Sequence, residues 1–298
     1  MANVNYTELF YSTQGEGRFM GVPSIFLRMF GCNFRCKNFG RLEQDILSDQ
    51  EVHNPEVAVI IKNLDQYKTF KDLPLVATGC DSYSSVYPEF KRFVIKETTD
   101  ELTTNIINLL PHRRWEDEHL VITGGEPLLG WQRAYPDLLS NEDMSWLKEL
   151  TFETNGTQPL SADFQQYLLN WTLNSKYSNR GSARGRDALA FSVSPKLSVS
   201  GEKWSDAICP EIVKSYEFVG HTYLKFVVAT ESDANEALKA IDEYRQAGFQ
   251  GPVYLMPVGG TSDTYFMNAK HVAELALEHG LRYSARLHVD LWKNAWGT

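Results

Sequence analysis

The sequence has few cysteines and no long apolar run, and both absences exclude classes of protein. Only 4 of the 298 residues are Cys, too few for a disulfide framework in a chain of this length. No stretch approaches the roughly 18 consecutive apolar residues of a membrane helix, and residues 1–10 lack the basic start and apolar segment of a secretion signal. We therefore expect a soluble, cytoplasmic protein with reduced thiols and no membrane partner.

An excess of basic residues is also absent. The chain has 29 Lys and Arg against 38 Asp and Glu, a formal net charge of −9. Because sequence-independent binding to duplex nucleic acid needs a broad basic surface, we expect no direct nucleic-acid partner. Hydrophobic residues make up 43% of the chain, which at this length is ample for a sizeable core. We expect a single domain over residues 1–298, with one insertion described below.

Short apolar runs alternate with helical patterns along most of the chain. Expected strands are 24–30, 119–123, 150–154, 189–193, 223–228, 253–256 and 282–289, and expected helices are 100–110, 162–171, 233–247 and 269–279. Thr98 and Glu101 have the spacing of a capping box before the first of these helices. Strands separated by helices of this length predict βα units and a mostly parallel α/β sheet.

Four segments rich in Gly, Asn and Pro follow expected strands. They are 123–127 (TGGEP), 153–156 (ETNG), 194–196 (SPK) and 257–260 (PVGG). Each segment alone is compatible with an ordinary turn, which favours these residue types. In a parallel α/β sheet, however, functional groups gather at the carboxyl ends of the strands. Four such segments in register therefore predict a functional site at that edge.

The cysteines suggest a metal centre. Cys32 and Cys36 lie in a Gly-bearing loop after the strand at 24–30, Cys80 follows later, and Cys209 lies next to a proline. Three thiolates around a loop can bind three irons of a 4Fe-4S cluster and leave the fourth iron open. Zinc is an alternative, but it prefers a fourth protein ligand, for which Cys209 is a poor candidate. In a third interpretation, all four are small buried hydrophobic residues.

The motifs resemble those of the radical S-adenosylmethionine superfamily, namely 31–36 (GCNFRC) and 124–127 (GGEP) within a βα sequence. Within that superfamily, the resemblance to 7-carboxy-7-deazaguanine synthases extends from Glu8 almost to the end of the chain. It rests on 14–17 (QGEG), 21–23 (GVP), Arg28, 153–156, 194–196 and His288. The resemblance implies a partial, open βα barrel related to the TIM barrel, and a homodimer.

One departure from the family pattern affects the metal site. The family has a third Cys where this chain has Phe39, but the run of Cys80, Asp81 and Ser82 resembles the residues that usually surround that Cys. We interpret residues 37–79 as an insertion in the cluster loop. Such an insertion is tolerable if its ends stay close, because loop-closure cost grows slowly with length. The apolar run 57–61 predicts a small packed element inside it. The alternative is a homologue that has lost its cluster.

The resemblance also implies the cofactors and their ligands. Cys32, Cys36 and Cys80 would hold a 4Fe-4S cluster, reduced by a protein such as flavodoxin or ferredoxin, and Ser82 would coordinate Mg²⁺ through its hydroxyl. Around S-adenosylmethionine it places Asp81, Gly124, Gly125, Glu126, Asn155, Ser194 and Lys196. The glycines would let the backbone approach the methionine part of the cofactor. Glu126 is more often structural in this motif.

The implied substrate is 6-carboxy-5,6,7,8-tetrahydropterin, and the implied product is 7-carboxy-7-deazaguanine, used in queuosine biosynthesis and other nucleic-acid modification. The implied substrate-binding residues are Thr13, Gln14, Gly15, Glu16, Arg28, Thr123 and His288. Arg28 suits a bidentate grip on the carboxylate, although a surface ion pair is the commoner role of such a residue. The catalytic candidates are Glu16, Glu153 and His288. Glu153 could instead anchor a turn, and His288 could be a core residue of a terminal strand.

Two alternatives to this function stay open. In the first, the radical chemistry is kept but acts on another purine-like or peptide substrate, because residues 37–79 and the Ser/Arg/Gly-rich run 174–187 reshape the pocket. The second run is typical of a mobile basic loop. In the second alternative, the protein is a non-catalytic binding homologue that uses the insertion as a contact surface.

Overall fold

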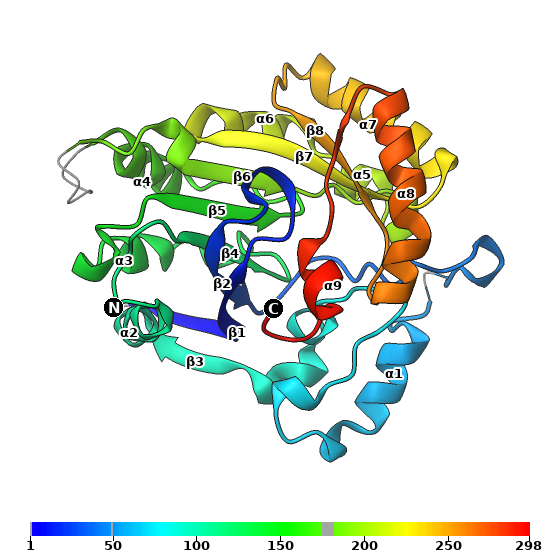
Figure 1. Cartoon of the computed structure of the whole chain (residues 1–298), viewed down its shortest axis with the longest axis horizontal. Coiled ribbons are helices and arrows are strands. Elements are labelled where there is room, and N and C mark those ends of the chain that lie inside the picture. Colours follow the sequence, from blue (N-terminus) through cyan, green and yellow to red (C-terminus); the bar gives the residue numbers. More distant parts are fainter. Residues whose placement is uncertain (1, 49, 175–181) are drawn as a thin grey trace.

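The computed structural model describes residues 2–48, 50–174 and 182–298. The strands in these residues form one open sheet of nine strands in the order β3-β1-β2-β4-β5-β6-β7-β8-β9 (Figure 1). β1 is antiparallel to β2 and β3, and every other neighbouring pair is parallel. The strands are β1 (Asn3–Thr13), β2 (Pro23–Met29), β3 (Ile95–Thr98), β4 (His119–Gly124), β5 (Glu149–Thr154), β6 (Leu189–Val193), β7 (His221–Val228), β8 (Val253–Pro257) and β9 (Arg282–Tyr283). The predicted mostly parallel α/β fold is confirmed.

Helices pack along the outer face of the sheet. The helices are α1 (Pro55–Lys62), α2 (Thr99–Leu109), α3 (Tyr135–Leu139), α4 (Ala162–Leu173), α5 (Trp204–Ala207), α6 (Pro210–Val219), α7 (Glu231–Gln246), α8 (Ser262–Glu278) and α9 (Leu287–Trp292). α2, α6, α7 and α8 contact β1, β7 and β8, whereas α9 and the C-terminus lie toward the middle of the molecule (Figure 1). Covered on both faces, β6 and β8 are buried along their whole length, as expected for parallel strands.

Most boundaries agree with the sequence pattern, including the capping box, in which Thr98 and Glu101 exchange both hydrogen bonds. The predicted strand at 282–289 is wrong. Only β9 is extended, and the chain then turns into α9, which carries His288. The apolar residues from Tyr283 to Val289 alternate as in a strand, but the Leu287 N–H donates to the Gly15 carbonyl at 2.9 Å. This long-range contact draws the segment away from the sheet edge.

Two strands, the helices α3, α5 and α6, and the first turns of α8 were not predicted from the pattern. β1 and β3 were not expected, so the strand at 24–30 is the second along the chain, not the first. The pairing of β1 with β2 shifts register between Tyr6 and Glu8, and such a bulge breaks the two-residue alternation that identifies a strand. α8 begins at Ser262 rather than at residue 269. Its extra turns follow a capping box formed by Thr261 and Thr264.

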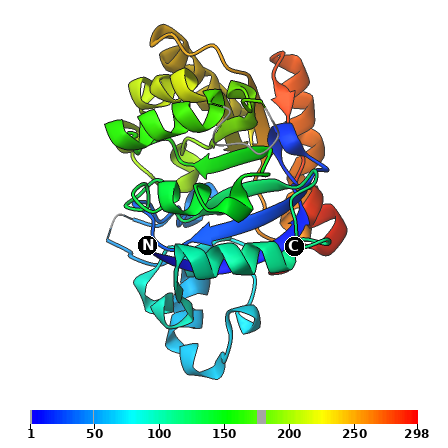
Figure 2. The same cartoon turned by 90° about the vertical axis from the view of Figure 1, so that its left-hand side faces the viewer.

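Residues 37–79 leave and rejoin the fold at one place. The Gly79 N–H donates to the Phe39 carbonyl at 2.7 Å, and the Asn54 side chain donates to the Lys37 carbonyl at 3.1 Å and to Thr78 at 2.9 Å. Within the segment, α1 buries two apolar side chains against a separate cluster formed by Val57, Ile60, Phe70, Leu73, Val76, Tyr83, Val86, Tyr87 and Phe90. The segment projects from the body of the molecule (Figure 2). This confirms the packed element at 57–61 and gives the closed ends that an insertion requires.

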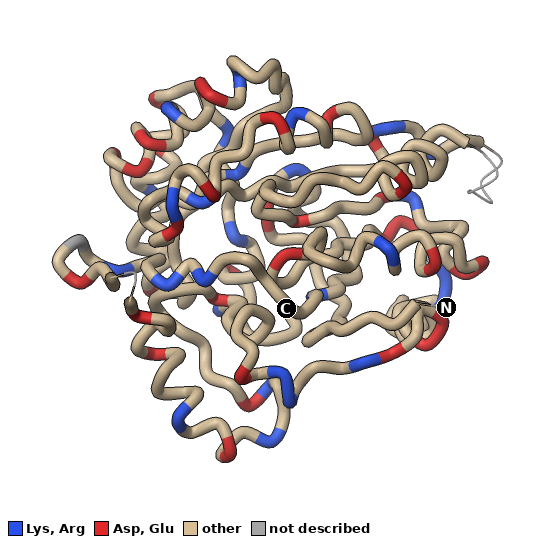
Figure 3. Tube along the Cα trace, turned by 180° about the vertical axis from the view of Figure 1, so that it is seen from behind, with Lys and Arg blue, Asp and Glu red and all other residues tan. Residues whose placement is uncertain are grey.

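Acidic and basic residues are mixed along the chain trace in Figure 3, without a broad stripe of either sign. In the parts of the chain that the structure describes, no helix has the length and apolar character needed to cross a bilayer. Of the Ser/Arg/Gly-rich run 174–187, residues 175–181 lie outside the described residues.

His119, at the start of β4, predicts a loss of stability in acid. The side chain is fully buried, and burial lowers its pKa to about 3, against about 6.5 in an unfolded chain. Because the unfolded chain takes up the proton first, stability is lost as the pH falls below about 6.5, by about 1.4 kcal/mol per pH unit. Between pH 7 and pH 5, His119→Gln should lose about 2 kcal/mol less stability than the wild type in urea unfolding.

The matched control is His112→Gln, because the His112 side chain is 64% exposed. The stability of His112→Gln should fall with decreasing pH by as much as that of the wild type. Superimposable pH profiles for the wild type and His119→Gln would show that His119 is not the group responsible.

Candidate active site

One pocket at the carboxyl ends of the parallel strands gathers nearly all the predicted site residues. It is lined by Thr13, Gln14, Gly15, Glu16, Arg28, Cys32, Cys36, Cys80, Asp81, Ser82, Thr123, Gly124, Gly125, Glu153, Asn155, Ser194, Lys196 and His288. Residues 257–260 line it as well, so the four Gly-, Asn- and Pro-rich segments do meet at one edge of the sheet. Glu126 is the predicted site residue that does not line the pocket.

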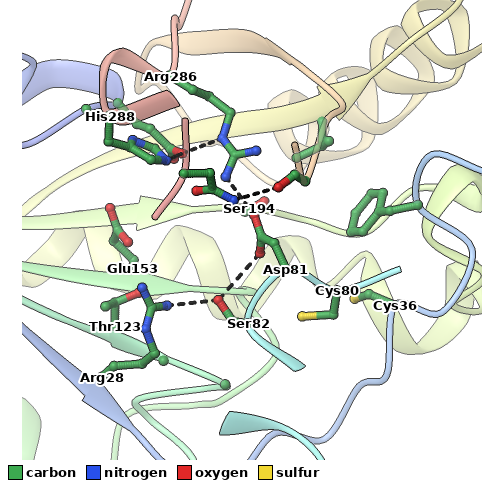
Figure 4. A pocket seen from close by; sticks show the side chains of 18 of the residues that line it. Arg28, Cys36, Cys80, Asp81, Ser82, Thr123, Glu153, Ser194, Arg286 and His288 are labelled. Atoms are coloured by element: carbon green, nitrogen blue, oxygen red, sulfur yellow. Dashed lines mark hydrogen bonds and ion pairs between the residues drawn. The ribbon is translucent and has the colours of Figure 1, made fainter. Parts of the chain in front are cut away.

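The three predicted cluster cysteines share this pocket although Cys80 is far along the chain from Cys32 and Cys36. Burial raises the pKa of Cys32 to about 11 and that of Cys80 to about 12, and it raises the pKa of Cys36 well above its usual range. All three are therefore thiols at neutral pH. Figure 4 shows the sulfurs of Cys36 and Cys80 near one another. Cys209 lies outside the pocket, as the N-cap of α6.

The thiols stand close enough to influence one another, since the charges of Cys80 and Cys32 add to the effect of burial on the pKa of Cys36. Over residues 2–48, 50–174 and 182–298, however, no group of three or more His, Cys, Asp or Glu stands in an arrangement that could hold a metal ion. The shared pocket supplies the donor atoms, and the ligand set itself stays a prediction.

At Gly124 and Gly125, the backbone at the end of β4 packs closely against the loop that bears Cys32. A Cβ at Gly124 would collide with the backbone of Met29, and one at Gly125 would collide with the Gly31 carbonyl and lie 2.9 Å from the Cys32 Cβ. The Gly125 N–H donates to the Met29 carbonyl at 3.1 Å. The close approach that glycine permits here is between two segments of this chain. The predicted contact with the methionine part of the cofactor stays a prediction.

Glu126 joins two strand ends from inside the protein. Its buried carboxylate accepts hydrogen bonds from the Thr154 hydroxyl at 2.8 Å, the Asn155 N–H at 2.7 Å and the Leu128 N–H at 3.0 Å. Burial raises its pKa, and these hydrogen bonds oppose the rise. The contacts favour the structural interpretation of Glu126 over a direct contact with a cofactor.

Lys196 places a positive charge beside the thiols. Its ammonium donates to the Ser194 hydroxyl at 3.1 Å and lies 5.9 Å from the ring centre of Phe39, where the family has its third Cys. Although burial dominates, this charge lowers the pKa of Cys32, Cys36 and Cys80. Lys196 thus favours the thiolate form that a metal centre needs.

Arg28 forms the ion pair that the sequence left as an alternative, but inside the pocket. Its Nε donates to Glu8 at 3.0 Å and its Nη1 donates to the Ser82 hydroxyl at 2.8 Å, as Figure 4 shows for the latter. The other carboxylate oxygen of Glu8 is buried and finds no partner within the described part of the chain. Because buried acceptors are rarely left unpaired, this oxygen is a candidate contact for a ligand N–H.

A network of charged groups surrounds Glu16. Its carboxylate pairs with Lys225 and with the Nε of Arg286 at 3.1 Å, and it lies 3.9 Å from the Nε2 of His288. Burial alone would raise the pKa of Glu16, but Lys225 and Arg286 outweigh it and hold the pKa below its usual range. Arg286 also donates to Asp81 at 2.6 Å. Glu16 is therefore an ionised acceptor, already engaged by the protein.

His288 lies against the turn after β1. Burial lowers its pKa to about 4, so the imidazole is neutral at physiological pH. A Cβ at Gly15 would collide with the His288 ring, which explains why glycine occupies that position. In the same turn, the Gln14 amide donates to Glu153 at 3.1 Å, so the Glu153 carboxylate is oriented by this partner.

Sequence reasoning gave no role to four charged residues of the pocket, which are Glu8, Arg35, Lys225 and Arg286. Lys225 left a usable signal, because it is the only Lys or Arg in the apolar run of β7 and a charge is rarely buried without a partner. Glu8 lies in a strand that was not expected. Arg286 lies in the segment wrongly predicted as a strand.

Comparisons with known proteins agree with this picture. No sequence-family model matches the chain. The 7-carboxy-7-deazaguanine synthase of Halobacterium salinarum is 29% identical, over 97% of this chain and 90% of the relative. That of Pyrobaculum aerophilum is 24% identical over 99% and 97%. A crystal structure of QueE from Escherichia coli matches the fold with a TM-score of 0.50 at 18% identity, covering 96% of this chain and 95% of the other. Over nearly its full length, and at low identity, the chain is similar to 7-carboxy-7-deazaguanine synthases.

Proposed function

We propose that this protein is a radical S-adenosylmethionine enzyme that converts 6-carboxy-5,6,7,8-tetrahydropterin to 7-carboxy-7-deazaguanine with loss of ammonia. The observation that carries the proposal is the meeting of three thiols, from two distant segments, in one pocket that also contains Arg28 and Gln14. Relatives that bear the name of this activity align over nearly the full chain.

The number and type of the donor atoms suit a 4Fe-4S cluster with one open iron, although the three thiols do not stand in a ligating arrangement within the described residues. Three thiols line the pocket, and Cys209 is not among its lining residues, so Cys32, Cys36 and Cys80 would leave one iron without a protein ligand. Ligation requires the thiolates, which Lys196 favours. A cluster held there would supply the electron for reductive cleavage of S-adenosylmethionine.

The remaining pocket residues would bind and orient the pterin substrate. Arg28, held between Glu8 and Ser82, presents a guanidinium suited to the carboxylate of the pterin. The unpaired oxygen of Glu8 would accept an N–H of the ring. Because Glu16 is held ionised by its partners, Glu153 is the better candidate to move a proton at its carboxylate. Thr13, Thr123 and the backbone of Gly15 would contact the ring edge.

Magnesium fits the described residues less well. The Ser82 hydroxyl already accepts a hydrogen bond from Arg28, and Asp81 is paired with Arg286, so two guanidinium groups would border the ion. Mg²⁺ needs several oxygen ligands, and none of these oxygens is uncommitted. A requirement for Mg²⁺ in turnover remains a prediction, and it is tested by removing Mg²⁺ from the assay.

Two further expectations depend on the family resemblance. A homodimer is tested by the molar mass in solution, and a flavodoxin- or ferredoxin-type reductant by whether such a protein supports turnover in place of dithionite.

The experiment that tests the function is anaerobic reconstitution followed by assay. The wild type should take up roughly four irons per chain and, with the pterin, S-adenosylmethionine, Mg²⁺ and a reductant, form 7-carboxy-7-deazaguanine. Formation of 5′-deoxyadenosine without the deazaguanine would assign the chemistry to another substrate. A colourless protein that takes up no iron would instead indicate a non-catalytic homologue.

Arg28→Lys should weaken substrate binding. A Lys cannot bind Glu8, Ser82 and a carboxylate together, because it lacks the fork of donors that Arg has. Losing one charged hydrogen bond of about 1.5–3 kcal/mol predicts a KM for the pterin at least about tenfold higher. The measurement is steady-state kinetics with varied pterin.

Arg18→Lys is the control, since Arg18 does not line the pocket, and its KM should be unchanged. If Arg28→Lys had a wild-type KM, Arg28 would only tie Glu8 to Ser82 and would not contact the substrate.

A further inference from the structure

The backbone of Cys36 has an unusual conformation. Its φ is +48°, in the left-handed region that residues with a Cβ seldom adopt. The side chain is only 5% exposed and lines the pocket. Strained conformations of this kind persist where the surroundings enforce them. The neighbours of Cys36 should therefore include a group that holds it in place.

Glu202 is that group. One oxygen of its carboxylate accepts hydrogen bonds from the backbone N–H groups of Arg35 at 2.8 Å and of Cys36 at 2.7 Å. Successive N–H groups around a left-handed residue form a concavity that binds anions, a device also found at iron–sulfur sites. Hydrogen bonds to a charged acceptor are roughly twice as strong as neutral ones. Here a carboxylate of the chain itself fills the concavity.

The segment that carries Glu202 is fixed to the same loop. The Glu202 N–H donates to the Ser200 hydroxyl at 3.2 Å, and the Asn38 N–H donates to the Ser200 carbonyl at 3.1 Å. A Cβ at Gly201 would lie 2.5 Å from the Asn38 side chain. Residues 198–202, which follow β6 in the chain, therefore form a brace against the cysteine loop.

The departure from the family pattern explains the use of such a brace. In the family, the third Cys follows the second closely, so metal ligation constrains both. In this chain, residues 37–79 separate Cys36 from Cys80, and the Gly79 to Phe39 hydrogen bond at 2.7 Å closes the segment beyond Cys36. The conformation of Cys36 itself depends on contacts from outside the loop.

The carboxylate of Glu202 also places a negative charge near Cys36. Its carboxylate oxygen lies 2.7 Å from the backbone nitrogen of Cys36, whose side chain lines the pocket. A negative charge beside an iron–sulfur centre favours the more oxidised cluster, because reduction adds a further negative charge.

We propose that Glu202 is a positioning residue that holds Cys36 in its pocket-facing conformation and makes a cluster bound there harder to reduce. The inference rests on the proposed function for the cluster. Its first part concerns the apoprotein and is tested without iron.

The first test is the rate at which iodoacetamide modifies Cys36 in the apoprotein, followed by peptide mass spectrometry. In Glu202→Ala the loop loses its brace, and we expect modification at least about tenfold faster, as for a locally opened segment. Glu202→Gln keeps an oxygen that accepts both N–H groups and should react nearly as slowly as the wild type. Equal rates in the wild type and Glu202→Ala would overturn the positioning role.

The matched control is Glu236→Ala. Glu236 accepts hydrogen bonds from the Ser198 N–H at 3.0 Å and from its hydroxyl at 2.5 Å, so it holds the same turn through Ser198 and not through the backbone of Cys36. It should leave the modification rate unchanged. Thermal unfolding of each variant establishes that it is folded, so faster modification of a variant with a wild-type melting curve reports on the loop alone.

The second test uses reconstituted protein. Glu202→Ala should bind less iron than the wild type, whereas Glu202→Gln should bind as much but reduce more readily. At a fixed potential, the ratio of reduced to oxidised cluster in Glu202→Gln should rise about tenfold, equivalent to ~59 mV for one electron. An unchanged potential would overturn the electrostatic role. A wild type that takes up no iron would overturn the proposed function, while the modification rates would still decide whether Glu202 positions Cys36.

Discussion

Cys80→Ala should lose its cluster as completely as Cys32→Ala. Both side chains line the same pocket, and a site-differentiated cluster needs all three thiolates. From roughly four irons per chain in the reconstituted wild type, each variant should fall below about one. The measurement is iron content together with the visible absorption of the anaerobic protein.

Cys209→Ala is the control for this experiment. Cys209 lies outside the pocket, and its thiol donates to the Asp206 carbonyl at 3.7 Å, so its loss should leave the iron content unchanged. If Cys80→Ala kept the iron content of the wild type, residues 37–79 would not be an insertion between two cluster ligands. The loop after Cys36 would then need a different interpretation.

The central strands could be predicted from the sequence because parallel strands covered on both faces are continuously apolar. The predicted bounds of β6 match the structure, and β4, β5, β7 and β8 differ only at their ends. The location of the site followed from the same rule, since the segments after these strands meet at their carboxyl ends. The fold class and the assembly of the pocket were therefore accessible from local pattern and topology.

The residues that escaped prediction depend on contacts between distant segments. Arg286 joins Asp81, 205 positions away, to Glu16, 270 positions away, and no local pattern can indicate such pairs. The bulge in β1 removed its alternation. The segment after β9 has the alternation of a strand, but a hydrogen bond to Gly15 holds it elsewhere. In each case tertiary structure overrides the local signal.

Arg286 connects three parts of the site. Its guanidinium reaches Asp81 after the third predicted cluster ligand, Glu16 in the turn after β1, and the Gly259 carbonyl after β8. The Arg286 side chain is 8% exposed and that of Glu16 is 14% exposed, so these charges are largely shielded from water. The cysteine loop and the predicted substrate turn are therefore linked through one residue of the C-terminal segment.

Arg286→Met should strongly destabilise the protein, because it removes an ion-pair partner from the buried Glu16 carboxylate and from Asp81. Breaking a buried ion pair typically costs 3–5 kcal/mol, and we expect about 3 kcal/mol, the low end, because Glu16 keeps Lys225 as a second partner. The measurement is the free energy of unfolding in urea. The control is Arg92→Met, whose pair with Asp65 is exposed, at 45% and 100%, and which should cost less than about 1 kcal/mol. Equal losses in the two variants would mean that the Arg286 network contributes no more than a surface ion pair.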